Sequence, residues 1–261
     1  MKTKKKFLIQ SSKGRKLGRN IVLILMIVIL GVGSGALIGA FLGLTHDLPQ
    51  IRSLSDFKPS SVTRILADDG SLLAEIYTEN RVPVSINDMP PALLDAIITT
   101  EDRKFFNHSG IDVKGILRAA VRDIMAGEFV EGASTITQQL AKTLFLTSHK
   151  TLFRKLQEAV LAFQIERRYT KNEILELYLN QIYLGSGAYG VSSAAKIFFG
   201  KSLSDLSLGE CALIAAMPRA PSRYSPLVNQ DLALKRRNIV LKQMLATGNI
   251  SEPEYRDAID E

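Results

Sequence analysis

A glutamate on an apolar helix face is the first residue in this chain that suggests chemistry. Glu101 lies in the segment TTEDRKFFNH, residues 99–108, and a helix is predicted to start before it, near Pro91. The side chains that recur there at the three- and four-residue spacing of a core-facing stripe are Leu94, Ile97, Ile98, Glu101 and Phe105. Such a position partly removes the carboxylate from water, which disfavours its charged form and raises its pKa. A general base or acid that works near neutral pH needs a raised pKa, so Glu101 is the first candidate catalytic residue.

A second polar cluster lies in GASTITQQLAKTLF, residues 132–145. Ser134 is predicted to cap a helix on which Gln138 and Lys142 share a face at i,i+4. Exposed N–H groups, hydroxyls, amides and a lysine near one helix start suit an anionic ligand, especially a phosphate. An ordinary solvated helix face explains the same residues, and the local sequence leaves both interpretations open.

The third cluster is RKLQE, residues 154–158, in which Arg154 and Lys155 both flank Glu158 at helical spacing. A surface salt bridge of a few tenths of a kcal/mol is one interpretation. Glu158 also opens an apolar run, EAVLAFQI, typical of a buried helix. A carboxylate at that position with two cations beside it could hold a metal ion or a diphosphate, and both interpretations stay open.

Three other patterns are excluded as sites. Gly200-Lys201-Ser202 resembles the end of a phosphate-binding loop, but Ala195 stands where the first glycine belongs. Ser193 and Lys196 fit the SxxK pattern of penicillin-reactive serines, yet no KTG follows. His108 has no second histidine at ligand spacing, so a zinc site is not expected.

Four segments occur in a fixed order: EDRKFFNHSG (101–110), GASTITQQ (132–139), RKLQE (154–158) and KNEILELYLNQIYLG (171–185). In this order and spacing they closely resemble the peptidoglycan glycosyltransferases, glycosyltransferase family 51. That family occurs in class A penicillin-binding proteins and as monofunctional transglycosylases. The resemblance covers roughly residues 60–250, and the ordered set of four segments is far more specific than any one of them.

The resemblance implies a mainly α-helical, lysozyme-like domain on the outer face of the cytoplasmic membrane. Enzymes of this family polymerise lipid II. The 4-hydroxyl of the acceptor GlcNAc attacks the anomeric carbon of a lipid-linked donor chain, the configuration inverts to a β-1,4 bond, and undecaprenyl diphosphate leaves.

The resemblance also implies roles for individual residues. Glu101 would be the general base that deprotonates the acceptor hydroxyl, and Glu158 would act on the donor side together with a divalent cation, Mg or Mn. No organic cofactor is expected. The residues expected to contact substrate are Asp102, Ser134, Thr135, Gln138, Lys142, Arg154 and Lys155. With Asp102, the residues that complete the first motif and support Glu101 structurally are Phe105, His108 and Gly110.

The charge of the chain is concentrated at its start. The pI of about 9.4 suggests nucleic acid, but residues 1–20 carry eight basic groups and no acidic one. The whole chain has a net charge of +7, which leaves −1 for everything after residue 20, so nucleic acid is not expected as a partner. The single Cys211 excludes an intrachain disulfide framework.

A membrane anchor is predicted directly after the basic tail. Residues 21–44 carry no charge, and as a helix they would extend roughly 36 Å, enough to cross a bilayer core. A cleaved signal peptide is the alternative, but its apolar core is usually shorter. The basic flank places the N-terminus in the cytoplasm and the rest of the chain outside. Glycines at 31, 35, 39 and 43 form GxxxG steps, which either pack against another helix or reflect the frequency of glycine in membrane helices.

The expected organisation is a basic cytoplasmic tail (1–20), a signal-anchor helix (21–44), a juxtamembrane linker (45–61) and a glycosyltransferase domain (62–250). Residues 251–261 form a C-terminal helix or the start of a linker. Within the domain, a small β-hairpin is predicted around Asp69-Gly70 and helices from Pro90 onward. Capping boxes are predicted at Thr170–Glu173, Ser207–Glu210 and Ser251–Glu254.

Several alternatives remain at this stage. The chain is either a monofunctional polymerase or a piece of a bifunctional protein. A lytic transglycosylase and an inactive cell-wall scaffold are the rival functions. The expected partners are lipid II, a lipid-linked glycan strand and the membrane, with other cell-wall synthesis proteins or self-association through the glycine face as further candidates. Either core packing or contact with lipid would explain the apolar residues Ile116, Leu117, Ile124, Met125 and Phe129.

Overall fold

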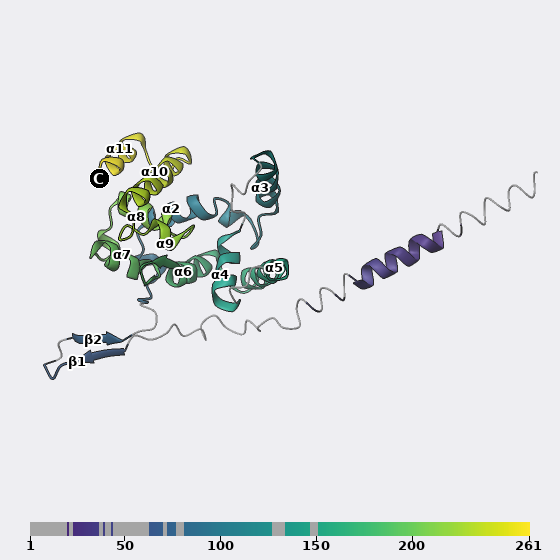
Figure 1. Cartoon of the computed structure of the whole chain (residues 1–261), viewed down its shortest axis with the longest axis horizontal. Helices are drawn as coiled ribbons and strands as arrows, with labels where there is room; N and C mark the ends of the chain where they lie inside the picture. The colour runs from purple at the N-terminus through teal and green to yellow at the C-terminus, as the bar shows by residue number, and fades with distance from the viewer. Residues whose placement is uncertain are drawn as a thin grey trace, which may run out of the picture. The chain divides into compact units, whose positions relative to one another are not determined.

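The computed structural model describes residues 20, 23–36, 39, 43, 63–69, 72–76, 81–126, 134–146 and 151–261. The chain divides into two compact units, Met1–Leu48 and Pro49–Glu261, and Figure 1 shows the elements of each.

The first unit contains a helix over residues 23–36. This helix falls within the predicted span 21–44, of which residues 21–22, 37–38, 40–42 and 44 lie outside the described residues. The predicted linker 45–61 and all but residue 20 of the predicted tail also lie outside them. Within the described part of the chain, no helix has both the length and the apolar character needed to cross a membrane.

The second unit begins with the hairpin expected from the sequence. Strand β1 (Thr63–Leu66) pairs antiparallel with β2 (Leu72–Ile76), so that Thr63 faces Ile76 and Ile65 faces Ala74.

Helices form most of the remaining described chain, and the mainly α-helical class predicted from the sequence is confirmed (Figure 1). They are α2 (Pro91–Glu101), α3 (Val113–Ala126), α4 (Ile136–Phe145), α5 (Leu152–Glu166), α6 (Lys171–Gln181), α7 (Val191–Phe199), α8 (Leu208–Ala216), α9 (Pro221–Tyr224), α10 (Gln230–Ala246) and α11 (Glu252–Asp260). Short 3₁₀ turns lie at Ile86–Asp88 (η1), Phe105–Asn107 (η2) and Leu203–Asp205 (η3). The three predicted capping boxes are present, and they open α6, α8 and α11.

The prediction of helix throughout the region after Pro90 is wrong at one place. Helix α6 stops at Gln181, and β3 (Tyr183–Gly185) and β4 (Ala188–Tyr189) form a second antiparallel pair. The turn between them needs positive φ at Gly185, Ser186 and Gly187, a conformation that glycine adopts without strain. The glycines therefore override the apolar pattern of ILELYLNQIYLG.

Two groups of packed helices position the site. Helix α8 packs against α2 and α10, and its buried run Cys211–Met217 includes three alanines that let the neighbouring helices approach closely. Helix α4 packs against α5 and α6. The C-terminus of α2 and the N-terminus of α4, which carry the first two motifs, are therefore each fixed by buried helices.

Helix α2 differs in detail from its prediction. Its fully buried stripe is Leu93, Ala96 and Ile97, whereas Leu94 and Ile98 are half-buried. Glu101 is its last residue, because Asp102 leaves the helical region with φ −160° and ψ 77°. Phe105 belongs to the separate turn η2, where it is fully buried. The first motif is thus a helix end followed by a turn, not one continuous helix.

Candidate active site

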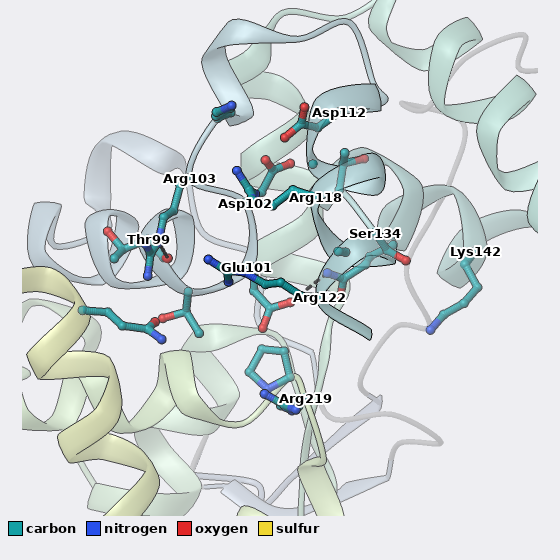
Figure 2. Close-up of a pocket in the computed structure, with 18 of the residues that line it drawn as sticks. Thr99, Glu101, Asp102, Arg103, Asp112, Arg118, Arg122, Ser134, Lys142 and Arg219 are labelled. Carbon is teal, nitrogen blue, oxygen red and sulfur yellow. Dashed lines mark hydrogen bonds between the residues drawn. The ribbon is translucent and has the colours of Figure 1, made fainter. Parts of the chain in front are cut away.

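A cavity of about 660 Å³ opens beside Glu101. Its walls come from the end of α2, from α3, from the start of α4, from the segment after α8 and from α10 (Figure 2). The basic residues that line it are Arg103, Lys104, Arg118, Arg122, Lys142, Arg219 and Arg236. The cleft is therefore strongly cationic although the chain after residue 20 is close to neutral, and such a field favours an anionic ligand.

Glu101 occupies the centre of the cleft in the view of Figure 2. Its Oε2 accepts a hydrogen bond of 2.8 Å from Nε2 of Gln139 on α4. Burial raises the pKa of Glu101, as predicted from the sequence. The hydrogen bond from Gln139 and the positive charges of Arg236 and Arg219 oppose this rise, and the neighbouring Asp102 adds to it. The carboxylate is therefore a stronger base than that of an exposed glutamate, and the hydrogen bond and the two cations limit this effect.

Asp102 joins the first motif to the second. Its carboxylate accepts the backbone N–H of Ile136, the first residue of α4, at 3.1 Å, and Nε2 of His108 at 2.9 Å. Nδ1 of His108 accepts the N–H of Gly110 at 3.2 Å, so the ring proton lies on Nε2 and points at Asp102. Asp102 lines the cleft, but its carboxylate is engaged by the protein itself.

Gly110 completes this connection. Its carbonyl accepts the hydroxyl of Thr135 at 2.6 Å. Its φ is +90°, and a Cβ there would lie 2.9 Å from the carbonyl oxygen of Ala162 on α5. Phe105 packs nearby with Lys171 Nζ 4.4 Å from the centre of its ring. Phe105, His108 and Gly110 thus occupy positions that fit the predicted structural support of Glu101.

The start of α4 corrects two predictions. Thr135, not Ser134, is the N-cap, and it forms a capping box with Gln138 in which each side chain bonds the other residue's backbone N–H. Gln138 is consequently buried in the cap and does not line the cleft, where it was expected to contact substrate. The amide that reaches the cleft is Gln139. Ser134, Thr135 and Lys142 do line it.

The third motif forms an ion cluster around one buried glutamate on α5. Glu158 is 2% exposed, and its two oxygens lie 2.7 Å from Arg154 Nη1 and 2.6 Å from Lys155 Nζ. Lys155 Nζ also donates to Ser134 Oγ at 2.6 Å, which connects the cluster to the edge of the cleft. The carboxylate of Glu158 is thus buried while Lys155 is about half exposed, and both cations are beside Glu158 as predicted.

A divalent cation does not fit Glu158 in this arrangement. Each of its carboxylate oxygens is in contact with a cationic side chain, and a metal ion would have to displace one. Among the described residues, no group of three acidic, histidine or cysteine side chains is placed to hold a metal ion. The expected Mg or Mn stays a prediction.

Four residues near Glu101 were missed from the sequence: Gln139, Tyr178, Arg219 and Arg236. The phenol of Tyr178 donates to Gln139 Oε1 at 3.2 Å, behind the contact with Glu101. Arg236 lies seven residues before Gln243 on α10 and both line the cleft, but neither belongs to one of the four motifs. Nothing local distinguishes Gln139 from Gln138 or marks Arg219.

The family model described as transglycosylase matches residues 69–245. The chain belongs to the transglycosylase family. This confirms the resemblance seen in the four motifs, and it makes the second unit a glycosyltransferase enzyme.

Relatives of this transglycosylase include several penicillin-binding proteins. Penicillin-binding protein 1A of Aquifex aeolicus is 46% identical over 90% of this chain and 33% of its own length. Penicillin-binding protein 1A of Escherichia coli is 44% identical over 89% of this chain and 27% of its own length. Penicillin-binding protein 1F of Bacillus subtilis is 48% identical over 74% of this chain and 27% of its own length. The chain thus spans about a third of these relatives or less. A crystal structure of penicillin-binding protein 1A from Haemophilus influenzae aligns at 29% identity and a TM-score of 0.45, covering 78% of this chain and 21% of that one.

Glu101→Gln is expected to stabilise the folded protein at pH 7. Folding raises the pKa of Glu101 above 4.5, which means that the folded state favours the protonated side chain. The protonated side chain therefore adds to the stability of the fold at low pH, and this contribution is lost as the pH rises through the folded-state pKa. The variant carries no such ionisation. Urea denaturation should give a higher midpoint for the variant at pH 7 and a difference that shrinks toward pH 4.

The matched control is Glu252→Gln, which removes an exposed carboxylate paired with Arg256 on α11. This variant should show no increase in its urea-denaturation midpoint at pH 7. A Glu101→Gln protein less stable than the wild type at pH 7 would contradict the assigned cost of burying this charge.

Proposed function

We propose that the chain polymerises lipid II into β-1,4-linked glycan strands, with inversion at the anomeric carbon and release of undecaprenyl diphosphate. The observation that carries the proposal is a half-buried carboxylate with a raised pKa, Glu101, in a cationic cleft that adjoins a second cation cluster around Glu158. A lysozyme-like arrangement of the helices is part of the same proposal.

Glu101 acts as the general base. It takes the proton of the acceptor 4-hydroxyl as that oxygen attacks the anomeric carbon of the donor. The new C–O bond forms on the face opposite the diphosphate, and the bond to the diphosphate breaks with its electron pair passing to the leaving oxygen. A base with a raised pKa is suited to this step, because the proton moves only as the hydroxyl becomes a nucleophile.

The donor diphosphate binds beside the third motif. Lys155 and Arg154 offer N–H donors to its oxygens and stabilise the charge that grows as the bond breaks. Lys155 already bridges Glu158 and Ser134, so it lies where the second and third motifs meet. Glu158 holds both cations in place, and Ser134, Thr135 and Lys142 line the same side of the cleft.

A membrane surface suits this substrate. Large apolar residues of α3 lie exposed to solvent: Leu117 is 64% exposed, and Ile124 and Met125 are more than 80% exposed. Ile116 is partly exposed, and Phe129 lies outside the described residues. The opposite face of α3 lines the cleft with Arg118 and Arg122. An amphipathic helix of this kind can lie in the interface beside a lipid-linked diphosphate.

We also propose that residues 21–44 anchor the chain in the cytoplasmic membrane, with its N-terminus in the cytoplasm and the catalytic unit outside. Self-association through Gly31, Gly35, Gly39 and Gly43, and contacts with other cell-wall synthesis proteins, remain proposals.

The lytic transglycosylase is the rival with the same type of catalytic residue. It cuts glycan strands with a sugar as the leaving group, and so has no use for two cations beside Glu158. The ion cluster therefore favours polymerisation. An inactive scaffold would have no use for a buried, destabilising carboxylate in a cationic cleft.

Glu101→Gln should lose polymerisation by about a thousandfold, since the amide cannot accept the proton. Purified protein is incubated with lipid II and the glycan product is sized, with Glu252→Gln as the matched control that keeps wild-type activity. Polymer from the variant at the wild-type rate would refute the role of Glu101. Cleavage of preformed strands without polymer would favour the lytic rival.

Lys155→Ala should keep the fold and lower the polymerisation rate by about a hundredfold, because the leaving diphosphate loses a charge-assisted donor. Lys201→Ala is the control: Lys201 pairs with Glu210 at 2.7 Å with similar exposure, far from the third motif in sequence. Equal rates for the Lys155 and Lys201 variants would show that the cluster does not bind the diphosphate.

A further inference from the structure

A buried phenol lies behind the proposed base. Tyr178, in α6, is 2% exposed, and its hydroxyl donates to Gln139 Oε1 at 3.2 Å. Burial raises the pKa of Tyr178 well above its ordinary value, and the negative charges of Glu101 and Asp102 raise it further. The group is therefore a neutral O–H donor at neutral pH.

The two partners of Gln139 together determine which way its amide points. An ionised carboxylate can only accept hydrogen bonds, so the amide nitrogen must face Glu101. The carbonyl end then faces Tyr178, whose O–H is a donor. Rotation of the amide by 180° would set its oxygen against the Glu101 carboxylate and its NH₂ against the phenol. The carboxylate thus selects this orientation, and the phenol O–H holds the carbonyl end of Gln139 in it.

We propose that Tyr178 is a positioning residue of the polymerisation reaction, which acts by holding the amide of Gln139 in the orientation that donates to Glu101. The contacts connect α6 to α4 and α4 to the end of α2. The Tyr178 hydroxyl lies 3.2 Å from Gln139 Oε1, and Gln139 Nε2 lies 2.8 Å from Glu101 Oε2. Tyr178 does not line the cleft. This inference rests on the proposed role of Glu101 and extends it to a residue outside the cleft.

The consequence concerns the ionisation of Glu101. A hydrogen bond from Gln139 stabilises the charged carboxylate and opposes the effect of burial. The other charged groups that act on Glu101 are Arg236 on α10, Arg219 before α9 and the adjacent Asp102. None of the three depends on the phenol for its charge, so removing the hydroxyl changes only the contribution of Gln139.

The test is Tyr178→Phe in the full chain, with the pKa of Glu101 followed by ¹³C NMR of its carboxyl carbon. The signal is assigned by its loss in Glu101→Gln. The proposal predicts a higher pKa in Tyr178→Phe than in the wild type, and about a tenfold lower kcat for polymerisation near pH 6 with an unchanged KM. Tyr189→Phe is the matched control, since it removes the same atom from β4, where the ring lies under Arg81 at 5.1 Å.

A double-mutant cycle tests whether the effect passes through Gln139. In a Gln139→Leu background, Tyr178→Phe should produce no further change in the pKa of Glu101. The same shift in both backgrounds, or no shift in either, would overturn the proposal. The titration needs no activity, so a wild-type chain that makes no polymer would refute the proposed function while the titration still decides on Tyr178.

The wild type supplies a second measurement if Tyr178→Phe does not fold. The side-chain NH₂ protons of Gln139 should exchange with water far more slowly than those of the exposed Gln230, because both ends of the Gln139 amide are hydrogen-bonded. Exchange of the Gln139 amide at the rate of Gln230 would show that nothing holds the orientation, and would overturn the proposal.

Discussion

The buried carboxylate of Asp102 is the contact on which the geometry of the site depends. It accepts a hydrogen bond from the backbone N–H of Ile136, at the N-terminus of α4, and another from Nε2 of His108. The other ring nitrogen of His108 accepts the N–H of Gly110. A carboxylate at a helix N-terminus also interacts favourably with the helix dipole. Removing it would leave a buried N–H and a buried imidazole N–H without partners, at a cost of about 1–3 kcal/mol for each. Because Asp102 follows Glu101 directly, the same contact sets where Glu101 lies relative to Gln139.

Two glutamates of this unit are withdrawn from water to different degrees, Glu158 fully and Glu101 in part, and they serve different purposes. Glu158 is held between two cations and serves to orient them. Glu101 accepts one neutral amide donor, with the cations acting on it through space. Burial of a carboxylate without a direct ionic partner costs stability. Such a cost is tolerated at a functional site, where a base must be available.

The helices, the caps and the charge clusters can be predicted from the sequence, because they depend on local periodicity and side-chain chemistry. The capping boxes at Thr170, Ser207 and Ser251 and the pairing of Glu158 with its cations follow from spacing alone. The strands β3 and β4 were missed, because glycines at 185 and 187 overrule an apolar pattern that fits a helix. Ser134 was mistaken for the cap because Thr135 beside it has the same capping chemistry. Gln139, Tyr178, Arg219 and Arg236 come together only through packing of distant helices, and no local pattern marks that contact.

The pH dependence of lipid II polymerisation tests most directly whether Glu101 is the base. The wild-type rate should rise with pH along an acid limb whose midpoint lies above 4.5, the ordinary value for a glutamate, because burial raises the pKa of Glu101. Gln139→Leu removes the hydrogen bond that opposes this rise, so its acid limb should move to higher pH. An acid limb at the same pH in both proteins, or a wild-type midpoint below 4.5, would contradict the assignment of Glu101 as the group that takes the proton.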